Sequence, residues 1–211
     1  MSEKTSHIPE QTFLEVLDDA SAAAEGSGVP YAYIGSVATT AMGRPGSFPI
    51  GEDIDLFVRA EDARTLLEAL GEAGFATDEW DHAWWLHKAA KRDVVVDVIF
   101  ESTGGISMDE EMTSRVRVER FKGRKVNVVS PEDLVVMKVV ANQEEKAGYW
   151  HEALAVLTRQ DLEWDYLVRR AEQYSVHRVL SLLVYAQSLD LDVPADVLRR
   201  LFRLVLPPEG G

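Results

Sequence analysis

The sequence predicts an α/β (α+β) core over residues 1–129, followed by a helical C-terminal region over residues 130–211. β-prone and helical segments are mixed in the first part, whereas only helical apolar spacing follows it. The boundary itself is a typical helix start. Ser130 can cap the helix, Pro131 suits its first turn, and Glu132 and Asp133 favour the positive end of its dipole. We therefore expect two domains that meet at Ser130.

The predicted elements of the core follow from the spacing of apolar residues and from the turn residues between them. Helical spacing predicts helices over residues 10–25, 37–42 and 60–71, the second of which starts at the turn formed by Gly35 and Ser36. Runs of β-branched and aromatic residues predict strands over residues 29–34, 54–58, 94–100, 115–118 and 125–129, with residues 75–88 extended. Residues 43–51 are rich in Gly and Pro and predict a loop.

The composition narrows the classes of protein and of site. No apolar run approaches the roughly 18 residues that a membrane span needs, and the N-terminus lacks the apolar stretch of a secretory signal. The chain has no cysteine, which fits the cytoplasmic location that we expect without requiring it. Any metal ligands must then be oxygen or imidazole, which favours Mg²⁺. The net charge of −14 argues against a broad nucleic-acid-binding surface, since phosphate contacts require Lys and Arg.

The first candidate catalytic feature is the pair Asp53 and Asp55 at the start of a predicted strand. Residues two apart in a strand point to the same face, roughly 6–7 Å apart along the chain. Two carboxylates held this close are costly unless a cation neutralises them. The pair alone is a weak motif, and a chance acidic strand end is the alternative.

Asp97 is the second candidate, because it lies in the middle of the strongly apolar strand predicted over residues 94–100. A carboxylate in such a strand needs a charged partner to offset its desolvation. A metal shared with Asp53 and Asp55 on a neighbouring strand would be that partner. Hydrogen bonds from the backbone or from an arginine are the alternative.

Two further positions suit an anionic ligand. Gly35 and Ser36 join a predicted strand to a predicted helix, so that the backbone can approach a phosphate and the hydroxyl and helix N-terminus can donate to it. Lys138 is the only charge in an apolar stretch of the first C-terminal helix. A buried ammonium requires an anion, for which a triphosphate is a candidate. The alternative is that Lys138 extends to solvent.

Two segments each have two interpretations. Residues 115–125 carry six positive charges and one negative, which indicates either a hairpin with one solvated face or a docking surface for an anionic substrate. The aromatic residues between Trp80 and His87, which include Trp84 and Trp85, either pack in the core or line the pocket of an acceptor or a base.

Together, Gly35-Ser36, Asp53-x-Asp55, Asp97 and Lys138 resemble the nucleotidyltransferase fold superfamily. The chain looks more closely similar to the AbiEii-type toxins of bacterial toxin–antitoxin systems and to their MenT relatives. The resemblance covers about residues 31–168 and implies a mixed β-sheet flanked by helices. The resemblance implies that Asp53, Asp55 and Asp97 bind the metal ion and carry out catalysis. It implies that Gly35, Ser36, Lys138 and Glu152 bind the nucleotide.

Two positions depart from the pattern of that family. Glu152, in Trp150-His151-Glu152-Ala153-Leu154, replaces the usual Asp with a longer side chain. An insertion-like segment over residues 44–52 precedes the acidic pair, where relatives often have an Arg-x-Ser-x-Asp-Ile-Asp segment.

The implied reaction moves a nucleoside monophosphate from an NTP to an acceptor hydroxyl, with Mg²⁺ or, alternatively, Mn²⁺ as the cofactor and pyrophosphate as the leaving group. In the toxin-like group the acceptor is expected to be tRNA or another macromolecule, and an antitoxin protein is an expected partner. A small hydroxylated molecule, as for aminoglycoside and lincosamide nucleotidyltransferases, is the alternative, and the acidic charge balance favours a cationic one. A catalytically silent nucleotide-binding partner protein is the third interpretation.

Overall fold

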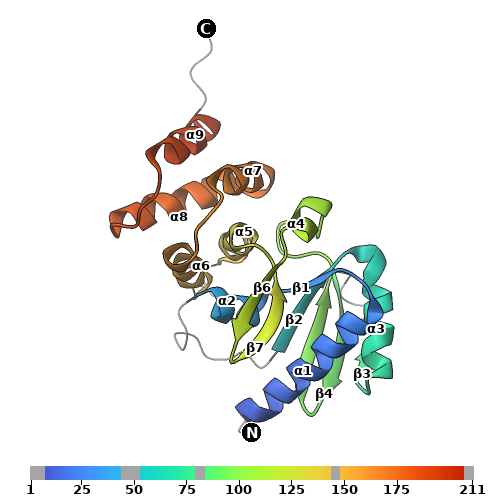
Figure 1. The fold of residues 1–211 in the computed structure, drawn as a ribbon. Coiled ribbons are helices and arrows are strands. Elements are labelled where there is room, and N and C mark those ends of the chain that lie inside the picture. The colour runs from blue at the N-terminus through green and yellow to red at the C-terminus, as the bar shows by residue number, and fades with distance from the viewer. Residues whose placement is uncertain (1–7, 44–52, 79–83, 144–147, 207–211) are drawn as a thin grey trace, which may run out of the picture.

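The computed structural model of the protein describes residues 8–43, 53–78, 84–143 and 148–206 (Figure 1). Its helices are α1 (Glu10–Ser27), α2 (Gly35–Met42), the short 3₁₀ helix η1 (Ala60–Asp62), α3 (Ala63–Glu72), α4 (Glu110–Ser114), α5 (Pro131–Ala141), α6 (Gly148–Arg159), α7 (Trp164–Tyr174), α8 (Val176–Ser188) and α9 (Ala195–Val205). Its strands are β1 (Tyr31–Tyr33), β2 (Asp53–Val58), β3 (Ala76–Asp78), β4 (Leu86–Lys91), β5 (Val94–Ile99), β6 (Arg117–Phe121) and β7 (Arg124–Val128).

The described strands form one seven-stranded mixed sheet in the order β3-β4-β5-β2-β1-β7-β6. β2 pairs with β5, and β1 with β7, in parallel, whereas the other neighbouring pairs are antiparallel. A mixed sheet flanked by helices confirms the predicted fold class. The predicted strand over residues 29–34 is shorter than expected, because only Tyr31–Tyr33 pair with β2, and of these only Tyr33 pairs with β7.

Helices α1 and α3 pack against each other and cover one face of the sheet (Figure 1). The first residues of β2 alternate between the two faces, since Ile54 and Leu56 are completely buried whereas Asp53 is exposed and Asp55 is partly exposed. On α3, Leu66 and Leu70 are fully buried one turn apart, as a helix with a single apolar stripe requires. This packing leaves the side chains of Asp53 and Asp55 on the opposite face of the sheet.

Helix α5 is the central helix of the C-terminal half and contacts α2, α6, α7 and α8. Residues 131–139 are all buried, which explains why apolar residues lie on every side of the helix after its first turn and why its charged residues need partners. The predicted helix start is confirmed: the hydroxyl of Ser130 accepts a hydrogen bond of 3.1 Å from the backbone N–H of Asp133, and Pro131 is the first helical residue. Helix α6 packs against α2 and α5, whereas α7 to α9 lie farther from the sheet (Figure 1).

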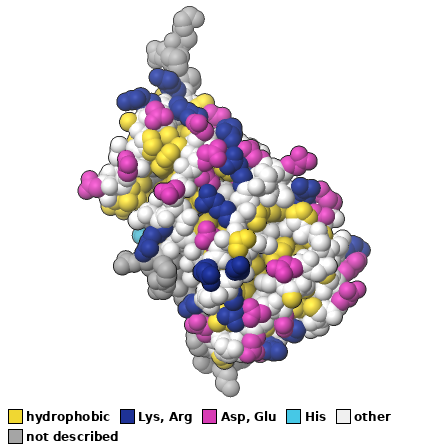
Figure 2. Space-filling model, viewed as in Figure 1, with side chains coloured by type: hydrophobic (Ala, Val, Ile, Leu, Met, Phe, Trp, Pro, Cys, Tyr) yellow, Lys and Arg dark blue, Asp and Glu magenta, His cyan; other side chains and the backbone are white. Residues whose placement is uncertain are grey.

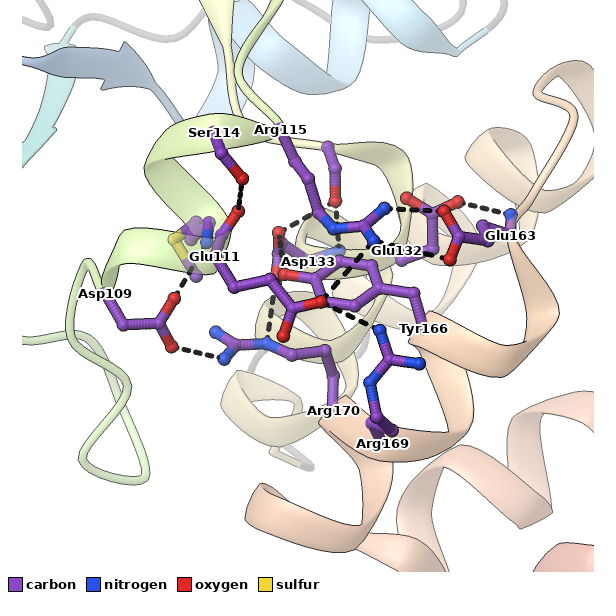
Figure 3. Close-up of polar contacts among 12 residues, drawn as sticks. Asp109, Glu111, Ser114, Arg115, Glu132, Asp133, Glu163, Tyr166, Arg169 and Arg170 are labelled. Atoms are coloured by element: carbon purple, nitrogen blue, oxygen red, sulfur yellow. Dashed lines mark hydrogen bonds and ion pairs between the residues drawn. The ribbon is translucent and has the colours of Figure 1, made fainter.

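A buried polar network joins the start of α5 to α7 and to the residue that precedes α4 (Figure 3). The carboxylate of Asp133 is fully buried and lies 2.8 Å from Nε of Arg170, which also reaches Asp109 at 2.6 Å. Tyr166 donates to Asp133 at 2.9 Å, and Ser130 does so at 2.8 Å. Burial raises the pKa of Asp133, although Arg170 and the two hydroxyls favour its charged form. The network therefore compensates a charge that is out of reach of water.

None of the described helices combines the length and the apolar character needed to cross a membrane.

Candidate active site

Three carboxylates meet on the face of the sheet that α1 and α3 leave open. In the parallel pairing of β2 with β5, Asp55 lies directly beside Asp97, and Asp53 lies two residues before Asp55 on the same face. One carboxylate oxygen from each of the three residues lies within 4.8 Å of the others. The sheet register thus brings together the acidic residues that the sequence analysis singled out from two separate strands.

Asp55 occupies the most constrained position of the three. Burial, followed by the charges of Asp53 and Asp97, raises the pKa of Asp55 to about 7, while Lys138 and Lys88 oppose the shift. Two neighbouring carboxylates at this distance each disfavour ionisation of the other. A cation bound among them would relieve this repulsion, so the cluster has the electrostatic character of a cation site.

The turn between β1 and α2 fits tightly around Asp55. The backbone N–H of Ile34 donates to the carbonyl oxygen of Asp55 at 3.1 Å. Gly35 follows with a φ of +59°, and a Cβ atom placed there would lie 1.7 Å from Oδ2 of Asp55. A glycine is therefore needed at position 35 because the carboxylate of Asp55 lies against it. This is a second reason for the glycine, besides the predicted approach of a phosphate. Next to it, Oγ of Ser36 is buried and has no hydrogen-bond partner among the described residues.

Lys88 is a residue of the site that the sequence analysis missed. It lies opposite Asp97 in the β4–β5 pair, and its Nζ is 2.6 Å from Oδ1 of Asp97. The expectation that Asp97 requires a charged partner is thus met from within the protein, by a lysine and not by the arginine considered in the alternative. The sequence does contain an indication of this pair. If Arg92 and Asp93 form a two-residue hairpin turn, Lys91 pairs with Val94, and three residues farther along each strand Lys88 pairs with Asp97.

Lys138 projects from α5 toward the same site and is only 7% exposed, so the alternative in which it extends to solvent is wrong. Its Nζ lies 2.5 Å from Oε2 of Glu152 on α6 and 4.7 Å above the ring of Tyr149. Thr39 of α2 completes this group, because its hydroxyl lies 3.2 Å from the same Glu152 oxygen and 2.8 Å from the carbonyl oxygen of Gly35. The anion beside the buried ammonium is therefore Glu152.

A cavity of about 500 Å³ lies at this site, and its lining includes Gly35, Asp55, Asp97, Lys138 and Tyr149. Trp84 and Trp85, which the sequence places either in the core or at an acceptor or base pocket, line this cavity as well. Trp84 is 72% exposed and Trp85 is 39% exposed, so the core-packing interpretation is wrong for both. The rest of that segment, residues 79–83, and the insertion-like residues 44–52 lie outside the described residues.

The residues present fit a divalent metal ion and a nucleotide. Three carboxylate oxygens that can converge on one point are the ligands preferred by Mg²⁺ and Mn²⁺. The turn at Gly35 and the N-terminus of α2 provide backbone donors for an anion beside that point, and the buried, unpartnered Oγ of Ser36 lies next to them. A cation site next to an anion site within one cavity is the arrangement that phosphoryl transfer requires.

The profile of a protein family described as uncharacterised nucleotidyltransferase matches residues 44–189, which is more than half of the chain. The chain belongs to this nucleotidyltransferase family. No relative is found among the curated proteins.

Solved structures share the nucleotidyltransferase fold. ANT(2'')-Ia in complex with adenylyl-2''-tobramycin is similar with a TM-score of 0.54 and 19% identity over 76% of this chain and 95% of that chain. A Thermotoga maritima protein proposed to be a nucleotidyltransferase is similar with a TM-score of 0.50 and 17% identity over 72% of this chain and 98% of that chain. At these identities the likeness concerns the fold.

Proposed function

We propose that the protein transfers a nucleoside monophosphate from an NTP to a hydroxyl group of a small cationic acceptor. The observation that carries this proposal is the chemistry of the cavity beside the three carboxylates. Trp84 and Trp85 offer exposed indole surfaces there, and Glu101 adds a further negative charge. The carbonyl oxygen of Trp85 accepts from the backbone N–H of Glu101 at 3.4 Å, which holds the two residues together. Acidic and aromatic walls favour a cation with apolar faces.

The proposed step uses Asp97 as the general base. Asp97 accepts the proton of the acceptor hydroxyl, and the hydroxyl oxygen forms a bond to the α-phosphorus of the NTP. The bond between that phosphorus and the oxygen that bridges to the β-phosphate breaks, and pyrophosphate leaves with the electron pair. Asp97 suits this role because it lines the cavity, where its carboxylate can contact the hydroxyl of an acceptor.

Asp53, Asp55 and Asp97 would bind the divalent metal ion, proposed to be Mg²⁺, which supplies charge stabilisation at the triphosphate. Gly35 and Ser36 would donate to phosphate oxygens from the start of α2. Lys138 would add a positive charge to the same phosphates, and Glu152 would hold its ammonium at the cavity wall. Thus all the residues predicted for catalysis and for nucleotide binding have a place in one proposed site.

A toxin-like function, as in the AbiEii and MenT group, is the second candidate, with tRNA as the acceptor and an antitoxin protein as a partner. It is supported by three basic residues of the β6–β7 hairpin, Arg117, Arg120 and Lys125, which have no ion pair among the described residues. Their three neighbours Arg115, Lys122 and Arg124 are already paired with carboxylates. On the face shown in Figure 2, acidic side chains lie among the lysines and arginines, which makes this surface weaker for RNA.

A transfer assay with labelled NTPs separates these functions. The purified protein is incubated with each α-labelled NTP, Mg²⁺ or Mn²⁺, and either an aminoglycoside and lincosamide panel or total tRNA. We expect label on a small cationic acceptor, loss of labelling in Asp97→Asn, and full labelling in the matched turn variant Asp93→Asn. Label on tRNA alone would overturn the small-molecule proposal in favour of the toxin-like one. Label on no acceptor, with nucleotide still bound, would leave only a catalytically silent nucleotide-binding protein.

A further inference from the structure

Lys88 lies beside the cluster of Asp53, Asp55 and Asp97, and the proposed transfer reaction gives it no function of its own. Its side chain lies in the same row across the sheet as Asp97 and Asp55, because β4, β5 and β2 are neighbours in register. Its ammonium is 2.6 Å from Asp97, and both side chains are partly shielded from solvent, with exposed fractions of 32% and 13%. A charge in this position acts on the whole cluster of carboxylates and not on Asp97 alone.

We propose that Lys88 serves as a built-in cation that limits the nucleotide-free enzyme to a single divalent metal ion. This inference rests on the proposed function, since it concerns the metal site of the same three carboxylates.

The charges of the site support a single ion. Asp53, Asp55 and Asp97 carry three negative charges when ionised, and Lys88 contributes one positive charge beside them. The charges of Lys138 and Glu152 offset each other in their own ion pair. Two negative charges therefore remain on these six side chains, which one divalent ion balances, whereas a second ion would leave this cluster with an excess of positive charge before any triphosphate arrives.

The contact between Lys88 and Asp97 gives the same result from geometry. Oδ1 of Asp97 is engaged by the ammonium, so only the remaining lone pairs of this carboxylate are available to a metal. A second ion bound through Asp97 would have to displace Lys88 or lie beside it, and like charges at such distances repel. Lys88 is thus a positioning residue that keeps one oxygen of Asp97 out of metal coordination.

Mn²⁺ binding by the purified, nucleotide-free protein tests this inference. The number of bound ions per chain is measured by titration, with unbound Mn²⁺ followed by its paramagnetic resonance signal. The variants are Lys88→Met, Lys88→Arg and, as a matched control, Lys91→Met. Lys91 lies on the same strand but pairs with Asp19 of α1, at 2.7 Å, on the opposite face of the sheet. Near-ultraviolet circular dichroism verifies that each variant is folded, and Lys88→Gln replaces Lys88→Met if the latter is not.

We expect one ion per chain in the wild type, in Lys88→Arg and in Lys91→Met. In Lys88→Met we expect a second bound ion and at least about tenfold tighter binding of the first, because removing the ammonium leaves three unbalanced carboxylates. Equal numbers and affinities in the wild type and in Lys88→Met would overturn the inference, as would two ions in the wild type. If Asp53→Asn and Asp55→Asn bind Mn²⁺ as the wild type does, the three carboxylates are not the metal site, and the proposed function itself fails.

Discussion

The carboxylate of Asp55 lies directly against Gly35, so closely that a Cβ atom at Gly35 would be 1.7 Å from Oδ2 of Asp55. The strand that carries the acidic pair and the turn that starts α2 are therefore fitted to each other with no space for a side chain. This contact links the proposed metal ligand to the proposed phosphate-binding turn, and any larger residue at position 35 must displace one of them.

Gly35→Ala is expected to reduce nucleotidyl transfer at least about 100-fold, since misplacing a reacting group by about 1 Å has effects of this size. Gly28→Ala is the matched control, because Gly28 also has a positive φ, of +72°, but no atom within 4 Å of its added Cβ. Both variants should lose about 1–2 kcal/mol of stability from backbone strain. Equal activity of the two variants in a transfer assay would contradict a role for the Gly35–Asp55 contact.

Asp55→Asn is expected to stabilise the metal-free protein above neutral pH while abolishing transfer. The pKa of Asp55 is about 7 in the folded protein, against an ordinary value of 3.8, so the folded state binds this proton more tightly than the unfolded state. Stability therefore falls as the pH rises from about 4 to 7 in the wild type, and the variant escapes this loss of about 2–4 kcal/mol.

Urea unfolding in EDTA at pH 5, 7 and 8.5 measures the difference between Asp55→Asn and the wild type. The advantage of the variant should grow with pH, and adding Mg²⁺ should reduce it by stabilising the wild type alone. Glu172→Gln, an exposed change on α7, provides the control and should show no such trend. An advantage that is the same at all three pH values would mean that the charge of Asp55 is not its cause.

Lys138→Met is expected to raise the KM for the NTP about 10- to 100-fold, which corresponds to the loss of charged hydrogen bonds to the triphosphate. It should also lower stability by about 1–3 kcal/mol, because Glu152 is left without its partner. The double variant Lys138→Met with Glu152→Gln separates these effects. Its stability should recover while its KM stays high; recovery of both would assign Lys138 to packing and not to substrate.

Arg170→Met is expected to destabilise the protein by about 3–5 kcal/mol, because it leaves the fully buried Asp133 uncompensated. The neighbouring Arg169→Met is the control, since Arg169 pairs with Glu111 at 2.8 Å where both side chains are about half exposed. That loss should stay below about 1 kcal/mol. Chemical denaturation measures the free energy of unfolding of the two variants. Similar losses of stability would show that the buried network around Asp133 contributes no more than an exposed ion pair.

Trp84→Ala is expected to change stability by less than about 0.5 kcal/mol, since the side chain is 72% exposed. Its KM for the acceptor should rise about 5- to 20-fold with the loss of an aromatic contact surface. Phe202→Ala, which removes another exposed aromatic residue on α9, should leave that KM unchanged. A KM that does not respond to Trp84→Ala would place the acceptor elsewhere.

Two charged residues of the candidate site can be recognised from the sequence, because each lies in an apolar segment where a charge is costly. Asp97 in an apolar strand and Lys138 in an apolar helix each require a charged partner, and each has one. The partners themselves, Lys88 and Glu152, depend on strand register and helix packing. Lys88 cannot be recognised from an extended segment over residues 75–88 alone, because the turn at Arg92 and Asp93 sets the register that places it opposite Asp97.

The exposure of aromatic residues was the least predictable feature of the site. Trp84 and Trp85 are residues of a type common in cores, and only the structure shows that both are exposed and line the cavity. The start of the first C-terminal helix was predicted from its local capping chemistry, which needs no tertiary information. The division into two domains at Ser130 stays a prediction, because α5 packs against α2 as well as against the later helices.

The parallel register of β2 with β5 has a consequence for how the chain acquires function during refolding. Asp55 and Asp97 become neighbours only when two strands some 40 residues apart in the sequence have paired, and a slip by one residue turns every side chain of a strand to the other face. Such non-local pairing is slow compared with local helix formation. Cation affinity should therefore emerge late, after helical signals have recovered, and report the correct alignment of the sheet rather than the compaction of the chain.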